Sequence, residues 1–284
     1  MEEPVVIIGA PRSGTNMLRD ALDRFPQIVT WPCDEINYIW RHGNIRYPSD
    51  EFVPDMATTP VARYIRAQFS ILSRRNDVPV VLEKTCANSL RVGFVDRVLP
   101  NARYIFIHRN GLDAVASAMK RWTADLDPGY IYRKARYVPP ADLPYYASRY
   151  LWNRVYRWFS GTERLAFWGP QLSGMQELME RPSLVEVCGL QWQRCVNSAA
   201  EAFETMPESK VLDVSYEKFV VSPVEEMRRV VEFLGLEKDE SLIQEIGRGI
   251  SPASVGNWRN DLAEDDVLRL KALIGATLDR YGCS

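Results

Sequence analysis

A glycine-containing turn near the amino terminus is the first part of the sequence that could do chemistry. Residues 5–8 (VVII) predict a buried strand, residues 9–16 (GAPRSGTN) a loop, and residues 17–25 a helix that stops before Pro26. A loop of this kind presents successive backbone N–H groups and the positive end of a helix, which together bind phosphate. An ordinary tight turn between strand and helix would also contain two glycines, so the loop alone leaves both interpretations open.

The spacing of the two glycines resembles that of an ATP-binding loop, but the following residues differ. Gly9 and Gly14 have the Walker A spacing, whereas Thr15 and Asn16 stand where that motif requires lysine followed by serine or threonine. The lysine for the terminal phosphates and the hydroxyl group for magnesium are both missing, which counts against hydrolysis of ATP or GTP. Arg12 supplies a positive charge from within the loop instead.

A second candidate site follows the predicted strand at 103–107. Asn110 can cap the next helix with Asp113 at its third position, which places Arg109 at the carboxyl end of the strand. Ser117 then lies about two turns into that helix. A guanidinium and a hydroxyl near one helix start suit a second phosphate group. Arg109 could equally be the partner in a structural ion pair.

These residues need a parallel sheet to bring them together. Further strands are predicted at 80–83 and 210–214, and a helix at 225–234 that ends at Gly235. Short strands that alternate with amphipathic helices predict an α/β fold with a central parallel sheet.

The length of 284 residues fits one large domain or two modest ones. The stretch 122–168 is rich in tyrosine, tryptophan and arginine, and strand-like segments resume only after it. We therefore predict a single domain, 1–284, with a helical, aromatic-rich insertion at about 122–184 on the acceptor side.

The overall charge is nearly balanced, with 35 basic and 37 acidic residues and a formal net charge of −2. This balance lowers the expectation of a nucleic-acid or membrane partner, so any anion must be held by a local site. Five cysteines without a CxxC pair and two histidines argue against a metal site or a disulfide framework. The amino terminus lacks the pattern of a signal peptide and no run of about eighteen apolar residues occurs, so we expect a cytoplasmic protein.

Several motifs in this order resemble the sulfotransferase family that uses 3′-phosphoadenosine 5′-phosphosulfate (PAPS). They are PRSGT at 11–15, EKT at 83–85 and Arg109 followed eight residues later by Ser117, joined by VSYEKF at 214–219, FLGL at 233–236 and VGNWR at 255–259. The resemblance covers about 1–120 and 185–260 and is closest to the tyrosylprotein and heparan-type branches and their bacterial relatives. The Arg-Lys-Gly triplet of the cytosolic steroid and phenol enzymes is absent. The family implies a three-layer, P-loop-like fold.

The resemblance also implies which residues bind the nucleotide. The first loop would bind the 5′-phosphosulfate through Arg12, Ser13, Gly14, Thr15 and Asn16. Asn16 departs from the threonine often found there. The 3′-phosphate would be bound by Arg109 and Ser117. Further contacts near the nucleotide would come from Tyr216, Val255, Gly256, Trp258 and Arg259.

Transfer of a sulfuryl group needs an in-line acceptor, cations around the transferring group and a base for the acceptor proton. We expect Arg12 and Lys84 to be the cations and Glu35, in the segment 31–37, to be the base. Adjacent side chains of an extended segment point to opposite sides, so Asp34 is the alternative to Glu35. His42 is another alternative base. No magnesium requirement and no metal ligand are expected.

Glu83 precedes the predicted catalytic lysine. It is expected either to orient Lys84 or to pair with a cation of the loop, although a buried ion pair without a catalytic function is an equal alternative.

The sequence thus predicts a PAPS-dependent sulfotransferase, with PAP as product, acting on a hydroxyl group or, as second choice, an amine. The acceptor would be a small molecule or glycan, because related enzymes that sulfate protein tyrosines work in the secretory pathway. Aromatic residues of the insertion could stack on it: Tyr130, Tyr132, Tyr137, Tyr145, Tyr146, Trp152 and Trp158. A P-loop kinase or NTPase and an inactive PAP-binding module are the alternatives.

Overall fold

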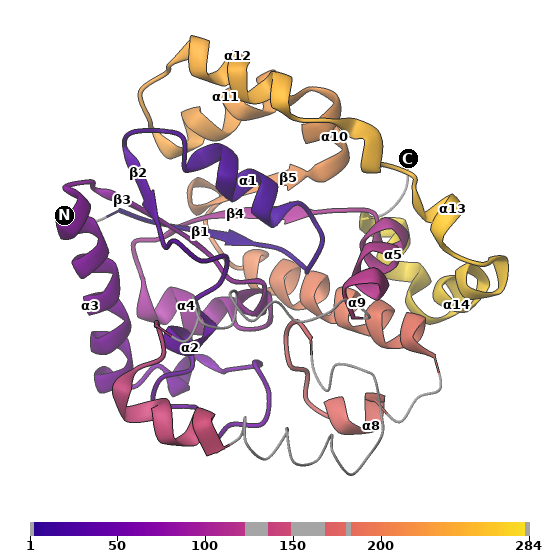
Figure 1. Cartoon of the computed structure of the whole chain (residues 1–284), viewed down its shortest axis with the longest axis horizontal. Coiled ribbons are helices and arrows are strands. Elements are labelled where there is room, and N and C mark those ends of the chain that lie inside the picture. Colours follow the sequence, from indigo (N-terminus) through magenta and orange to yellow (C-terminus); the bar gives the residue numbers. More distant parts are fainter. Residues whose placement is uncertain (1–2, 123–135, 149–167, 180–182, 282–284) are drawn as a thin grey trace.

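Five parallel strands form the central sheet of the protein (Figure 1). The computed structural model describes residues 3–122, 136–148, 168–179 and 183–281. The order of the strands across the sheet is β2-β3-β1-β4-β5, and every neighbouring pair is parallel. The strands are β1 (Glu3–Ile8), β2 (Ile28–Thr30), β3 (Val80–Lys84), β4 (Arg103–His108) and β5 (Val211–Ser215).

The sheet is covered on both faces, which explains why its strands read as continuous apolar runs. Val5 and Ile7 of β1 belong to one buried cluster, and Val6 and Ile8 belong to the other. The four strands predicted from the sequence are confirmed, with small shifts at their ends. The strand β2 was not predicted, because three residues are too few to show a periodic pattern.

One face of the sheet packs against helices from both ends of the chain. Leu18 and Leu22 from the first helix and Val230 from a later one are fully buried in the same cluster as Ile7. Figure 1 shows these helices together above the sheet. They are α1 (Thr15–Leu22), α10 (Tyr216–Val221), α11 (Pro223–Leu234) and α12 (Glu240–Gly249). As predicted, α11 ends at Gly235, which has a positive φ of 63°.

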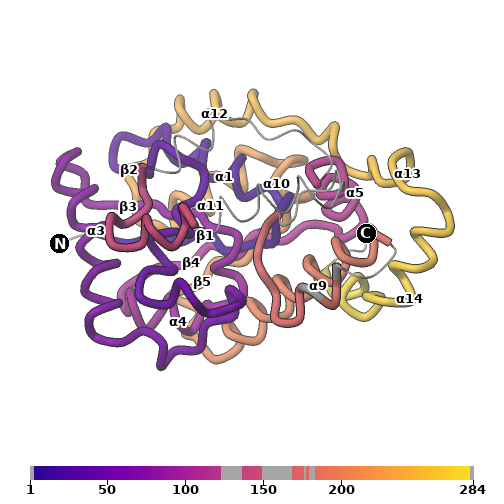
Figure 2. The backbone as a smooth tube through the Cα atoms, turned by 60° about the horizontal axis from the view of Figure 1, so that its bottom comes forward, coloured from indigo at the N-terminus to yellow at the C-terminus, as the bar shows by residue number. Residues whose placement is uncertain are grey.

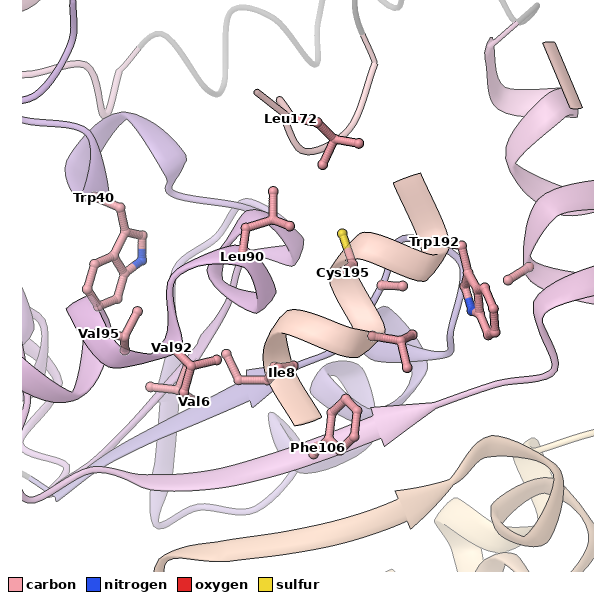
Figure 3. Close-up of a cluster of buried hydrophobic side chains, with 14 of the residues drawn as sticks. Val6, Ile8, Trp40, Leu90, Val92, Val95, Phe106, Leu172, Trp192 and Cys195 are labelled. Atoms are coloured by element: carbon pink, nitrogen blue, oxygen red, sulfur yellow. The ribbon is translucent and has the colours of Figure 1, made fainter. Parts of the chain in front are cut away.

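The opposite face carries the larger group of helices. Figure 3 shows Val6, Ile8 and Phe106 of the sheet in the same apolar cluster as Cys195 and Trp192. The last two belong to a long helix that packs against its neighbours in this layer. The helices are α3 (Thr59–Asn76), α4 (Val92–Val98), α5 (Gly111–Trp122), α9 (Leu184–Phe203) and α14 (Glu264–Tyr281). The helices α3 and α14 lie at opposite ends of the molecule (Figure 1, Figure 2). This three-layer α/β arrangement confirms the predicted fold class.

Several short helices connect these elements. They are α2 (Asn37–Trp40), α8 (Met175–Met179) and α13 (Trp258–Asp261), with 3₁₀ helices η1 (Pro54–Met56), η2 (Cys86–Leu90), η3 (Pro140–Asp142), η4 (Glu208–Lys210) and η5 (Pro252–Ser254). Within the described residues, no helix combines the length and apolar character needed to cross a membrane.

The predicted insertion at 122–184 falls only partly within the described residues. Trp122 belongs to α5 and Leu184 begins α9, so both ends of the predicted range belong to the flanking helices. The described part between them contains η3, the helical residues 143–148 and α8. Residues 123–135, 149–167 and 180–182 lie outside the description, and the insertion as a unit stays a prediction.

The strand order determines where chemistry can take place. The chain runs from β1 to β2 and β3 on one side, then to β4 and β5 on the other, so the connections diverge around β1. In α/β sheets, ligands bind at the carboxyl ends of the strands where such a reversal occurs. Ile7 pairs with Lys84, and Ile8 pairs with Phe106. The loop after β1 therefore begins between the carboxyl ends of β3 and β4.

Candidate active site

The loop between β1 and α1 is pressed closely against its neighbours. A Cβ atom added to Gly9 would lie 2.4 Å from the carbonyl oxygen of Ile107, and one added to Gly14 would lie 2.4 Å from a ring carbon of Tyr216. Gly14 also has a positive φ of 90° at the start of α1. Glycine is required at both positions, because a side chain would displace the loop from β4 or α10.

Arg12 adopts a backbone conformation that is uncommon for arginine. Its φ is 69°, in the left-handed region that costs a residue with a side chain about 1–3 kcal/mol. Its Nε donates a hydrogen bond to Oγ of Ser117 over 2.8 Å. Burial and the positive charges of Arg121 and Arg109 lower the pKa of Arg12. Several guanidinium groups therefore meet at the loop, and an anion bound among them would relieve their repulsion.

Arg109 joins the loop to the carboxyl-terminal part of the chain. Its Nη1 donates to the carbonyl oxygen of Arg12 over 3.1 Å, and its Nη2 donates to that of Ser254 over 2.6 Å. The guanidinium lies over the ring of Tyr216, 4.5 Å from the centroid, and the Tyr216 hydroxyl is 2.6 Å from Oγ of Ser254. The hydroxyl of Ser117, which was expected to act with Arg109, is instead bonded to Arg12.

Two buried donors beside the loop fit an anionic ligand. The hydroxyl of Ser13 is fully buried, and Nε of Arg109 lies in a side chain that is only slightly exposed. Neither atom has a hydrogen-bond partner among the described residues. Buried polar groups in folded proteins are nearly always hydrogen-bonded, so each unsatisfied group needs an explanation. A phosphate or sulfate in the loop would supply the missing acceptors.

The remaining loop residues differ in their surroundings. Thr15 is buried at the first position of α1, with its Oγ1 3.7 Å from Sγ of Cys86. Asn16 is exposed on the first turn of the same helix. Ser13, Gly14 and Thr15 thus line the turn, while Asn16 is exposed and faces away from the buried part of the loop.

Glu35 and Lys84 form an ion pair next to this loop. Nζ of Lys84 lies 3.3 Å from Oε1 of Glu35, and the backbone N–H of Cys86 donates to the same oxygen over 3.2 Å. The Lys84 side chain is 2% exposed and that of Glu35 is 25% exposed. Burial alone would lower the pKa of Lys84, but neighbouring acidic groups, Glu35 foremost, raise it above its usual value. Lys84 is therefore protonated at neutral pH.

The backbone around Glu35 is anchored to the end of β3. The N–H of Ile36 donates to Oγ1 of Thr85 over 3.1 Å. Cys86 connects this region to the loop, since it contacts Thr15 through its sulfur and Glu35 through its amide. Burial raises the pKa of the Cys86 thiol to about 12, so it remains protonated and unreactive. No pattern in the sequence indicates that Cys86 links these two regions.

Glu83 does not orient Lys84 and does not bind a cation of the loop, which corrects the expectation from the sequence. Its carboxylate accepts hydrogen bonds from Oγ1 of Thr85 over 2.5 Å and from Nδ2 of Asn88 over 2.8 Å. The side chain is fully buried, and burial raises its pKa to about 7. Because side chains alternate along a strand, Glu83 and its neighbour Lys84 point to opposite faces of β3.

The titration of Glu83 should make stability depend on pH. The unfolded chain releases the Glu83 proton near pH 4.5 and the folded chain near pH 7, so the folded state is favoured at low pH. We expect Glu83 to contribute a stabilisation of about 3 kcal/mol that is lost as the pH rises across this interval. Urea unfolding of the protein and of Glu83→Gln between pH 4.5 and 8 measures this contribution. Parallel curves for the two proteins would contradict the assignment.

The alternative base His42 is engaged elsewhere. Its Nδ1 lies 2.8 Å from Oδ2 of Asp142 in η3, and its ring centroid is 4.0 Å from that of Tyr64 in α3. Asp34, the other alternative, contributes to the raised pKa of Lys84 and so lies in the same electrostatic environment as Glu35. Glu35 is therefore in direct contact with Lys84, whereas His42 is hydrogen-bonded to the segment 136–148.

Aromatic side chains of the same segment contact the helix that follows Glu35. The rings of Tyr38 and Tyr146 pack edge to face with centroids 4.8 Å apart, and Tyr145 packs on Tyr146 at 5.4 Å. Tyr137 lies partly buried against the core. Of the aromatic residues proposed to contact an acceptor, Tyr137, Tyr145 and Tyr146 lie within the described residues. The others lie outside: Tyr130, Tyr132, Trp152 and Trp158.

The carboxyl-terminal segment 254–259 is attached to the start of α5. The buried carboxylate of Asp113 accepts the N–H of Gly256 over 2.7 Å and that of Trp258 over 2.9 Å. The guanidinium of Arg259 lies over the Trp258 ring at 4.6 Å. Val255 is 39% exposed, an apolar surface next to the Arg109 region.

The cap of α5 is only partly as predicted. Oδ1 of Asn110 accepts the N–H of Leu112 over 2.9 Å, which confirms the cap. Asp113 does not complete a capping box, because Glu217 accepts the N–H of Asn110 and Asp113 binds the distant segment. Sequence reasoning missed the contributions of Asp113 and Ser254. No local pattern could have revealed them, because their partners lie far away along the chain.

A known protein family matches the sequence, and solved structures match the fold. A family profile described as the sulfotransferase family matches residues 4–159 and 154–240. The chain belongs to the sulfotransferase family. The match includes the loop after β1, the Glu35–Lys84 pair and Arg109, and it ends before the segment 254–259. No curated protein sequence matches this sulfotransferase significantly.

Solved sulfotransferase structures share the fold of this sulfotransferase at low sequence identity. The sulfotransferase domain from the curacin biosynthetic pathway superposes with a TM-score of 0.57 and 11% identity, covering 97% of this chain and 98% of that one. The domain from the Synechococcus PCC 7002 olefin synthase gives 0.54 and 16%, covering 96% and 95%. Mouse sulfotransferase SULT7A1, solved in complex with PAP, gives 0.52 and 15%, covering 99% and 89%.

Proposed function

We propose that this sulfotransferase moves the sulfuryl group of PAPS to a hydroxyl group of a small molecule or glycan, with Glu35 as the base. The observation that carries the proposal is the loop after β1. There, clustered guanidinium groups and an unpartnered buried hydroxyl lie beside the Glu35–Lys84 pair. A family member solved with PAP, mouse SULT7A1, supports the choice of nucleotide.

The two ends of the nucleotide would be bound by different parts of the site. The 5′-phosphosulfate would lie in the loop, where Ser13, Gly14 and Thr15 line the start of α1 and Arg12 supplies charge. The 3′-phosphate would lie near Arg109, whose Nε has no described partner. Tyr216 and the segment 254–259 lie on the same side as Arg109 and would border the adenosine.

Binding of the 3′-phosphate would change the hydrogen bonds of Ser117. Its hydroxyl accepts from Arg12 in the structure. Because a hydroxyl group can donate while it accepts, Ser117 could donate its O–H to the 3′-phosphate and keep its bond from Arg12. Ser117 would then connect two residues that the resemblance assigns to opposite ends of the nucleotide.

The chemical step would use Glu35 and Lys84 in two different roles. The acceptor oxygen bonds to sulfur while the bond from sulfur to the 5′-phosphate oxygen breaks, and PAP leaves with that electron pair. The acceptor proton passes to the Glu35 carboxylate, whose orientation is fixed by Lys84 and the Cys86 amide. Protonated Lys84 and Arg12 stabilise the charge that develops on the leaving oxygen.

Incubation with ³⁵S-labelled PAPS and a panel of phenols, alcohols, amines and glycans tests the proposal. We expect label on at least one hydroxyl acceptor and stoichiometric release of PAP, without added magnesium. Binding of PAP without transfer to any acceptor would favour an inactive nucleotide-binding module. Magnesium-dependent turnover of ATP without use of PAPS would favour a kinase and contradict the proposal.

A further inference from the structure

The segment 254–259 carries residues assigned to the nucleotide, yet little in its own sequence fixes its position. The 3₁₀ helix η5 ends at the segment's first residue, Ser254, and the short helix α13 begins within the segment, at Trp258. Gly256 has a positive φ of 78° and the residue before it, Val255, is partly exposed. Such a short connection needs contacts with the rest of the protein to hold a defined conformation.

Those contacts converge on the end of β4 and the first turn of α5. The two oxygens of the Asp113 carboxylate each accept one backbone N–H of the segment, from Gly256 and from Trp258. Arg109 donates to the carbonyl oxygen of Ser254, and Tyr216 bonds to the hydroxyl of the same serine. The two bonds to Asp113, like the bond from Arg109, are charge-assisted and therefore about twice as strong as neutral ones.

Asp113 would act on the nucleotide only indirectly, through the backbone amides of the segment that it holds. It is 3% exposed, and its carboxylate lies in the first turn of α5, where the positive end of the helix favours a negative charge. Both carboxylate oxygens point to the segment, so Asp113 itself is not positioned as a ligand of a phosphate. The buried carboxylate therefore neither binds a phosphate nor presents its negative charge to one.

We infer that Asp113 is the positioning residue that fixes segment 254–259 over the nucleotide site and thereby controls nucleotide affinity. This inference rests on the proposed PAPS site. When the carboxylate holds Gly256 and Trp258, the segment is ordered before the nucleotide arrives, and binding does not have to supply the cost of ordering it. Loss of the carboxylate should weaken nucleotide binding while the Glu35–Lys84 pair stays unchanged.

Asp113→Asn is the sharpest variant to test this inference. The amide oxygen can still accept one N–H, but the NH₂ group then opposes the other, so one bond becomes a repulsion. We expect the Kd of PAP, measured by titration calorimetry, to rise about tenfold, which is the size of one lost charge-assisted hydrogen bond. In hydrogen exchange, amides of the peptide containing 254–259 should lose protection, while peptides of the loop after β1 should not.

Asp96→Asn in α4 is the matched control. Asp96 undergoes the same chemical change, and it accepts bonds from Tyr104 and Lys210 rather than from the segment. This variant should leave PAP affinity and the exchange of 254–259 unchanged. Once an acceptor is known, Asp113→Asn should raise the KM for PAPS with less than a threefold change in kcat, which a general loss of folded protein would not produce.

The outcomes separate this inference from the proposed function. If the unmodified protein does not bind PAP, the proposed function fails. If the unmodified protein binds PAP and Asp113→Asn binds it equally well, or if exchange in 254–259 is unaltered, the function stands and the positioning role of Asp113 is wrong. Should Asp113→Asn fail to fold, Asp113→Glu, which keeps the charge but displaces it, takes its place with the same expected rise in Kd.

Discussion

Replacing Glu35 by glutamine should lower the rate of sulfuryl transfer by about 10²–10⁴-fold, the usual contribution of a general base. Glutamine keeps the size of the side chain, and its amide oxygen can still accept from Lys84 and from the Cys86 amide. The variant loses the negative charge beside Lys84 and, with it, the capacity to take the acceptor proton. We therefore expect kcat to fall with ³⁵S-labelled PAPS, while the Kd of PAP changes by less than about threefold.

Asp34→Asn is the control for this prediction, because it alters the adjacent carboxylate in the same segment. Asp34 affects Lys84 electrostatically, so a small loss of activity is expected, within about tenfold. If Glu35→Gln keeps full activity, Glu35 is not the base. If Asp34→Asn loses most of its activity while Glu35→Gln stays active, Asp34 is the base. If His42→Asn is the one inactive variant of the three, His42 is the base.

Replacing Arg109 by methionine should weaken the binding of PAP about 10–100-fold, the effect of losing a hydrogen bond from a charged group to a phosphate. Methionine retains much of the apolar length of arginine over the Tyr216 ring, while the donors to the ligand are removed. Adenosine 5′-monophosphate has no 3′-phosphate, so its Kd should change far less. The ratio of the two dissociation constants, measured by calorimetry, isolates the 3′-phosphate contact.

The comparison of the two ligands also separates binding from structure. Arg109 holds the carbonyl oxygens of Arg12 and Ser254, so Arg109→Met will also lose some stability. A purely structural effect would weaken PAP and adenosine 5′-monophosphate by the same factor, which would contradict the assignment. Ser117→Ala should show the same selectivity for the 3′-phosphate with a smaller change, because it removes one neutral hydroxyl.

The sequence predicted the parts of the site that depend on neighbours along the chain. The loop after β1 is recognisable because Gly9, Arg12 and Gly14 occupy fixed offsets between a strand and a helix. Asn110 is recognisable as a cap because its partner is two residues away. Each of these features follows from local backbone geometry, which a single sequence shows directly.

Other parts depend on contacts that no local pattern contains. Asp113 resembles the third residue of a capping box, yet it binds Gly256, which lies 143 residues along the chain. For Glu83 the sequence left three roles open: orienting Lys84, pairing with a cation of the loop, or a buried ion pair without a catalytic function. The alternation of side chains along β3 instead directs it to Thr85 and Asn88. Long-range partners of this kind become visible only when the packing of the sheet is known.

The central claim is that the loop after β1 and the Arg109 region bind the two phosphate-bearing ends of a PAPS molecule. Calorimetric titration with PAP, without magnesium and in the presence of a chelator, tests this claim most directly. We expect one site per chain and at least about tenfold tighter binding of PAP than of adenosine 5′-monophosphate, since an additional phosphate meets Arg109. Binding of magnesium-ATP in preference to PAP, or no difference between PAP and adenosine 5′-monophosphate, would contradict it.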